Sequence, residues 1–185
     1  INGRTLNLSG TYSNSGTLNG SGVNSTLAFV GSSAQSFSVG TYTNSLITAM
    51  TINNASGVTL GAAVNATTLN LTNGNLNTTA ANLITVAGTA AGNITGGSTS
   101  SYVNGPLART FPVNLTAAAN YDFPIGKSTF NNLRLVNPKT ANVAGNVVIS
   151  AEVFDANAGG TPGIGITSLA TNRYWNTSIL SNAAN

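Results

Sequence analysis

The sequence contains no Asp, Glu, Lys, Arg or His between Arg4 and Arg109, a run of more than a hundred residues. Such a run excludes ordinary acid–base catalysis from this part of the chain, because that chemistry requires titratable side chains. No stretch in it reaches the ~18 consecutive apolar residues of a membrane-spanning helix. Hydrophobic residues make up 41% of the chain and recur regularly, which indicates a folded β structure rather than a disordered linker.

Short segments recur in this run with a period near 21 residues. The segment TLNL at residues 5–8 returns as TLAF at 26–29 and, two periods later, as TLNL at 68–71. A second series relates FSVG at 37–40 to VTLG at 58–61. A period of this length predicts an architecture of stacked repeats.

Within the repeats, apolar residues alternate with Thr, Ser or Asn, which indicates strands buried on one face. The alternating pairs are Leu6/Leu8, Leu27/Phe29, Met50/Ile52, Leu69/Leu71 and Ile84/Val86. Stacking of successive coils then predicts an all-β fold, a right-handed parallel β-helix of about four to six coils over residues 1–108. Outward Asn and Thr suit such a stack, because repeated charges would repel whereas these side chains hydrogen-bond along the ladder.

The composition changes after residue 105, since eight of the nine charged residues and every proline lie from Pro106 onward. Longer strands separated by Pro, Gly and Asn turns are expected at 131–136, 145–154 and 172–176. They predict an antiparallel β-sandwich-like module over residues 109–185, which either ends within this chain or continues beyond it.

Several segments resemble a known family. MTINNASGVTL at 50–60 and TLNLTNGNL at 68–76 are similar to the β-helical repeats of large secreted and cell-surface proteins of gliding bacteria that use type IX secretion. YVNGPL at 102–107, YDFPIGK at 121–127 and NRYW at 172–175 are similar to elements that follow those repeats. The resemblance covers most of residues 46–176. It implies an extracellular or surface role in adhesins, filaments or stalks, and it carries over no catalytic residue.

The residues available for chemistry also favour a protein that is not an enzyme. The acidic residues are Asp122, Glu152 and Asp155, and the chain has no His and no Cys. Glu152 and Asp155 lie three residues apart, so on an extended strand their side chains point to opposite faces and form a poor acid–base pair. Without His or Cys there is no catalytic triad, thiol nucleophile or standard zinc site.

Two candidate ligand contacts remain in the C-terminal part. Arg173, Tyr174 and Trp175 could contact a glycan through ring stacking, although we expect Trp175 to pack in the core. The segment 155–160 offers oxygen ligands for a structural calcium ion, but an Asx turn with Gly at positive φ explains it better. We therefore expect no cofactor.

The partners and location follow from composition and from the resemblance. The six basic residues are scattered, which argues against nucleic-acid binding. The Cys-free, Asn- and Thr-rich composition favours an extracellular or cell-surface location. We expect a stalk or filament component that contacts neighbouring domains, copies of itself or surface glycans.

A carbohydrate-binding or carbohydrate-processing module is the first alternative to this function. Ice binding is the second, because Thr5, Thr26 and Thr68 fall in register.

Overall fold

A computed structural model describes residues 1–113, 119–136 and 145–182 of the protein. The first nine strands are β1 (Thr5–Leu8), β2 (Tyr12–Gly20), β3 (Thr26–Phe29), β4 (Gln35–Asn53), β5 (Val58–Leu60), β6 (Val64–Asn73), β7 (Leu76–Asn77), β8 (Ile84–Val86) and β9 (Ile94–Gly96). The remaining strands are β10 (Val103–Asn104), β11 (Leu107–Phe111), β12 (Asn120–Gly126), β13 (Phe130–Val136), β14 (Val147–Phe154) and β15 (Tyr174–Ser181). A short 3-10 helix, η1 (Ala91–Asn93), precedes β9.

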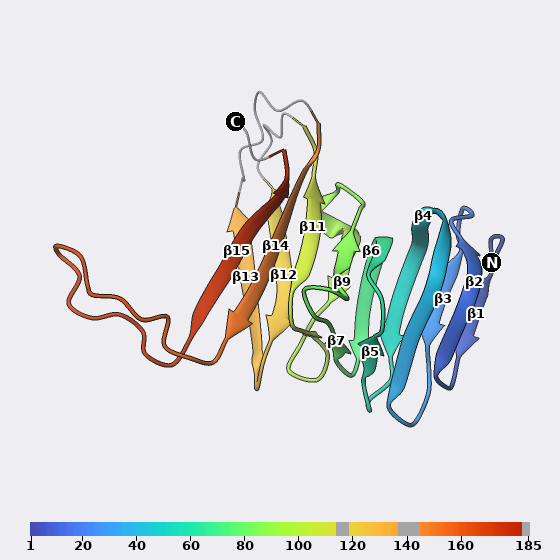
Figure 1. Ribbon diagram of the computed structural model, residues 1–185, viewed down its shortest axis with the longest axis horizontal. Helices are drawn as coiled ribbons and strands as arrows, with labels where there is room; N and C mark the ends of the chain where they lie inside the picture. The colour runs from blue at the N-terminus through green and yellow to red at the C-terminus, as the bar shows by residue number, and fades with distance from the viewer. Residues whose placement is uncertain (114–118, 137–144, 183–185) are drawn as a thin grey trace.

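The chain forms a β-solenoid of about five turns, as Figure 1 shows from the N-terminal end in blue toward the C-terminal end in red. Three columns of parallel strands build it. The first column contains β1, β3, the end of β4, the end of β6 and β9. The second runs from the start of β2 through the start of β4, β5, β7 and β10 to β12. The third runs from the end of β2 through β4, β6 and β8 to β11.

The alternating pattern predicts the buried face correctly. Leu27, Phe29, Met50, Ile52 and their equivalents in later turns are buried in one hydrophobic core, which extends from Leu18 to Val153. In the first turn, Leu6 and Leu8 are only partly buried and pack against that core. Burial of this continuous apolar stack is the main stabilising contribution to the fold.

The repeat register is confirmed in one series and wrong in the other. Thr5 pairs with Thr26, as the sequence predicts. Thr26 then pairs with Ala49 of the next turn, and Ala49 pairs with Thr68. In the second series, Leu60 rather than Val58 pairs with Phe37. The predicted register differs from the observed one by two residues. Successive side chains of a strand point to opposite faces, so a shift of two residues leaves the same side chains pointing inward. Hydrophobic periodicity alone cannot distinguish the two registers.

Outward polar side chains form ladders from turn to turn, as expected. Asn104 Nδ2 donates to Asn77 Oδ1 at 3.0 Å, and Asn77 Nδ2 donates to Thr59 Oγ1 at 3.3 Å. In the other two columns, Thr95 Oγ1 donates to Asn70 Oδ1 at 3.2 Å, and the hydroxyls of Thr17 and Thr41 lie 2.8 Å apart. These neutral contacts occupy positions where identical charges would face each other.

The C-terminal strands are antiparallel, as predicted. β14 pairs with β11 and β15, while β13 pairs with β12. β11 and β12 also pair in parallel with β8 and β10 of the solenoid, so the antiparallel strands extend its columns. The expected boundary between residues 108 and 109 falls within β11, and the division into two domains stays a prediction.

Candidate functional site

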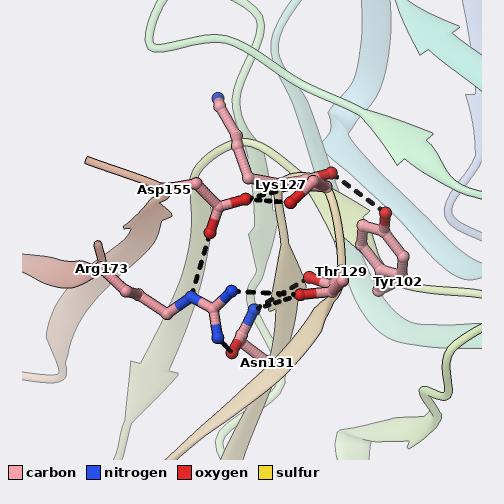
Figure 2. Close-up of polar contacts among 7 residues, drawn as sticks. Tyr102, Lys127, Thr129, Asn131, Asp155 and Arg173 are labelled. Atoms are coloured by element: carbon pink, nitrogen blue, oxygen red, sulfur yellow. Dashed lines mark hydrogen bonds and ion pairs between the residues drawn. The ribbon is translucent and has the colours of Figure 1, made fainter.

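A cluster of polar side chains surrounds Arg173, one of the three residues for which the sequence predicts ligand contact. Arg173 precedes β15, and its Nε donates to Asp155 Oδ1 at 3.0 Å. Its Nη1 donates to Asn131 Oδ1 at 2.8 Å and its Nη2 to Thr129 Oγ1 at 3.2 Å (Figure 2). All three guanidinium nitrogens therefore donate hydrogen bonds to protein groups, and Arg173 connects the start of β15 to the β12–β13 hairpin.

Asp155 lies immediately after β14 and receives hydrogen bonds on both oxygens. Besides Arg173, the hydroxyl and the backbone N–H of Ser128 donate to its Oδ2, the latter at 3.0 Å. The two Ser128 bonds, followed by Arg173, lower the pKa of Asp155 from 3.8 to about 2. The carboxylate is thus ionised and engaged by the protein at neutral pH.

Further contacts fix the β12–β13 turn on its other sides. Tyr102 Oη donates to the Lys127 carbonyl at 3.1 Å, which ties the turn to the last coil of the solenoid (Figure 2). Lys127 Nζ lies 3.2 Å from Glu152 Oε1 and 5.6 Å from the centre of the Phe154 ring. The cluster therefore joins the solenoid, the β12–β13 hairpin and β14.

The two aromatic residues after Arg173 do not form one binding platform. The Tyr174 ring stacks on Phe154 with a centroid distance of 4.9 Å. Trp175 pairs with Val153 and points to the opposite face, where it is 45% exposed. The expected core packing of Trp175 is wrong. β15 is the last strand of the sheet, beyond β14, so the face of β15 that carries Trp175 lies at the edge of the core and not inside it. Ligand contact by the trio stays a prediction, with Trp175 as the accessible ring.

The carboxylates lie in three separate ion pairs. Lys127 pairs with Glu152, Arg173 with Asp155, and Arg134 with Asp122. Within the described residues, no group of three or more His, Cys, Asp and Glu side chains could hold a metal ion. Each of the three carboxylates therefore lies beside its own basic partner.

The segment after Asp155 forms the predicted Asx turn. Asn157 Oδ1 accepts a hydrogen bond from the Gly159 N–H at 2.8 Å. Gly159 and Gly160 have φ values of 77° and 90°, which residues with a Cβ rarely adopt. The turn geometry therefore explains the residue types without a bound ion.

Comparison with known proteins finds no matching family model, no matching curated protein and no matching solved structure.

Sequence reasoning missed the role of Arg109, which is completely buried. Its Nη1 donates to the Asp122 carbonyl at 2.6 Å and its Nη2 to the Ala91 carbonyl at 2.7 Å. The guanidinium also lies 5.0 Å from the Tyr121 ring centre, and desolvation lowers its pKa to about 10. The alternation of Leu107, Arg109 and Phe111 on β11 could have placed Arg109 on the inward face.

Among the residues that the structure describes, no helix has the length and apolar character needed to cross a bilayer.

Proposed function

We propose that this chain is a non-enzymatic extracellular structural or adhesive protein, a stalk or filament-forming component of a cell surface. The observation that carries the proposal is the single core shared by about five solenoid turns and the antiparallel strands after them. A continuous parallel ladder resists bending and local opening, because each turn is hydrogen-bonded to its neighbours. The resemblance of residues 46–176 to surface proteins of gliding bacteria supports the same role.

The distribution of charge supports a mechanical role rather than catalysis or nucleic-acid binding. Three of the described basic side chains are paired with carboxylates, and Arg109 is buried. No continuous basic surface is left among them to follow a phosphate backbone. Partners that fit are neighbouring domains of a longer chain, further copies of this chain, and neutral surface glycans.

The proposal includes two finer points of architecture. The coils wind in the right-handed sense, since β-crossover connections are almost always right-handed. The strands β12–β13 and β11–β14–β15 form a sandwich-like module, with Phe123 and Ile125 from one layer and Val153 from the other in the core. An experimental structure tests both points.

Immunogold electron microscopy of unpermeabilised source cells tests the location, with permeabilised cells as the control. Labelling of the surface or of extracellular filaments is expected, and labelling confined to permeabilised cells would contradict the proposal. Light scattering of the purified chain separates the two structural roles, because polymers indicate a filament subunit and a uniform monomer indicates a stalk segment.

Ice binding is a second candidate, supported by one observation. On the outer face of the first column, Thr5 and Thr26 are paired, and Thr68 lies two turns further along the same line. Ala49 interrupts this line, so the array of hydroxyls is incomplete. Thermal hysteresis and ice-recrystallisation assays on the purified chain test the candidate, and inactivity at high protein concentration would eliminate it.

A further inference from the structure

A groove of about 330 Å³ lies between the segment around β9 and the outer face of the β12–β13 hairpin. It is separate from the Arg173 cluster. The solenoid contributes Ile94, Thr95, Gly96 and Gly97, and the hairpin contributes Asp122, Pro124, Phe130, Asn132 and Arg134. Its volume lies at the lower end of the range for small-molecule sites, about 300–1,000 Å³, which suits one small ring better than a large ligand.

The polar side of the groove is held in a fixed orientation. Asp122 Oδ1 accepts hydrogen bonds from Asn132 Nδ2 at 2.6 Å and from Arg134 Nε at 2.7 Å. Arg134 Nη2 donates to Asp122 Oδ2 at 3.0 Å, so the ion pair is bidentate. Both side chains stay partly exposed, at 52% for Arg134 and 37% for Asp122. The group therefore presents donors and acceptors to solvent with no net charge.

The other side of the groove is apolar. Phe130 lies on the same face of the hairpin as Pro124, and its ring is partly exposed. Gly97 has a φ of +90°, and a Cβ there would come within 2.6 Å of Pro124 Cβ and 3.8 Å of Phe130 Cε2. Glycine thus allows the backbone to pass close to the proline beside the exposed ring.

We propose that this groove binds one ring of a neutral sugar, a hexopyranose. Ring hydroxyls act as both donors and acceptors, so they can bond to the fixed Asp122, Asn132 and Arg134 groups. The C–H face of the same ring can pack on Phe130. A charged ligand is disfavoured, because Asp122 already neutralises Arg134. Binding here names the ligand of the proposed adhesive role and rests on that part of the proposed function, whereas the stalk or filament role is tested separately by microscopy and light scattering.

The sugar could be a free monosaccharide or the end residue of a glycan, and the experiment separates the two. The 185-residue chain is titrated with methyl glucoside, galactoside and mannoside, then with their disaccharides, and two-dimensional NMR spectra are recorded. Concentrations reach about 50 mM, well above a millimolar Kd. Equal affinity for one ring and for two indicates recognition of a single sugar, and tighter disaccharide binding indicates a glycan end.

Two groove variants and one matched control locate the binding. Asn132→Ala removes an exposed amide, and we expect it to weaken binding about tenfold through the loss of hydrogen bonds. Phe130→Leu keeps an apolar side chain without the ring, and we expect a loss of about threefold or more. Ile164→Ala removes an exposed apolar side chain outside the groove and should leave binding unchanged, while Trp175→Ala tests the other candidate glycan contact. Circular dichroism checks that each variant keeps the wild-type fold.

Three results would overturn the proposal. The first is the absence of chemical-shift changes with every neutral sugar. The second is binding that only acidic sugars such as methyl galacturonide produce. The third is a loss of binding in folded Trp175→Ala while both groove variants bind normally, which would assign the sugar to the segment 173–175 instead.

Discussion

Arg173 Nε lies 3.0 Å from Asp155 Oδ1, an ion pair that joins the residue before β15 to the residue after β14. These two residues flank a long connection, which leaves the body of the molecule in Figure 1 and returns to it. The pair closes the base of this connection, while Asn131 and Thr129 attach the same guanidinium to the neighbouring hairpin. Arg173 therefore fixes where β15 begins.

Replacement of Arg173 by Ala should lower the free energy of unfolding by about 1–2 kcal/mol. The loss reflects three hydrogen bonds, reduced because the side chain is about one-third exposed. Urea denaturation measures it. Arg134→Ala is the matched control, since its more exposed ion pair should contribute little. Equal stabilities for the two variants would show that Arg173 does not hold β15.

Stability should depend on pH in the acidic range. The Ser128 hydrogen bonds and Arg173 lower the folded-state pKa of Asp155 from 3.8 to about 2. A lowered folded-state pKa stabilises the protein above the unfolded-state pKa, and this stabilisation is lost as pH falls from about 4 toward 2. Melting temperatures between pH 2 and 7 test this.

The variant Asp155→Asn should reduce this dependence. It should also melt at a lower temperature than wild type at pH 7. Some dependence should remain, because hydrogen bonding to Arg134 also lowers the pKa of Asp122. An unchanged slope of melting temperature against pH in Asp155→Asn would rule out Asp155 as a source.

Gly74 should tolerate no side chain. It has a φ of +77°, and a Cβ would lie 1.7 Å from the Asn54 carbonyl oxygen of the preceding turn. We expect Gly74→Ala to destabilise the protein by about 3 kcal/mol, through backbone strain and the displacement of one turn from the next. Gly92→Ala is the control, because nothing lies within 4 Å of its Cβ position, and its effect should be below about 1 kcal/mol. Similar melting temperatures for the two variants would contradict the close stacking at Gly74.

Like charges in one ladder should repel. Asn77 and Asn104 are paired between β7 and β10, so Asn77→Lys combined with Asn104→Lys places two ammonium groups side by side. A double-mutant cycle should give an unfavourable coupling of about 0.2–1 kcal/mol, smaller in 1 M salt. Asn77→Glu with Asn104→Lys should give a coupling of opposite sign. A zero coupling in both pairs would remove charge repulsion as the reason for the uncharged ladders.

Arg109→Lys should destabilise the protein by about 2 kcal/mol or more. An ammonium group cannot reproduce the planar guanidinium that reaches the carbonyls of Ala91 and Asp122 together. Chemical denaturation measures the loss. Arg4→Lys, at an exposed position, should have no measurable effect. If the buried and exposed substitutions were equally harmless, the Arg109 hydrogen bonds would contribute nothing to the fold.

The sequence predicts the solenoid well because each turn repeats the same inward pattern, as in Leu27/Phe29 and Met50/Ile52. It predicts the Phe37 register poorly, since a slip of two residues keeps the same side chains inward. The exposure of Trp175 depends on β15 being an edge strand, which no local pattern shows. The groove beside Asp122 was missed for a similar reason. Its lining residues lie on two segments more than twenty residues apart, which only the folded chain brings together.

The stacking of turns can be measured directly, because the chain has no native cysteine. Spin labels are attached at Asn7→Cys on β1 and Thr95→Cys on β9, both in the first column. These two positions are separated by four strand-to-strand spacings, so their backbones should be about 19 Å from each other. Double electron–electron resonance should then give one narrow distance distribution near this value. A broad distribution centred near about 50 Å, as expected for a flexible chain of this length, would contradict the continuous solenoid.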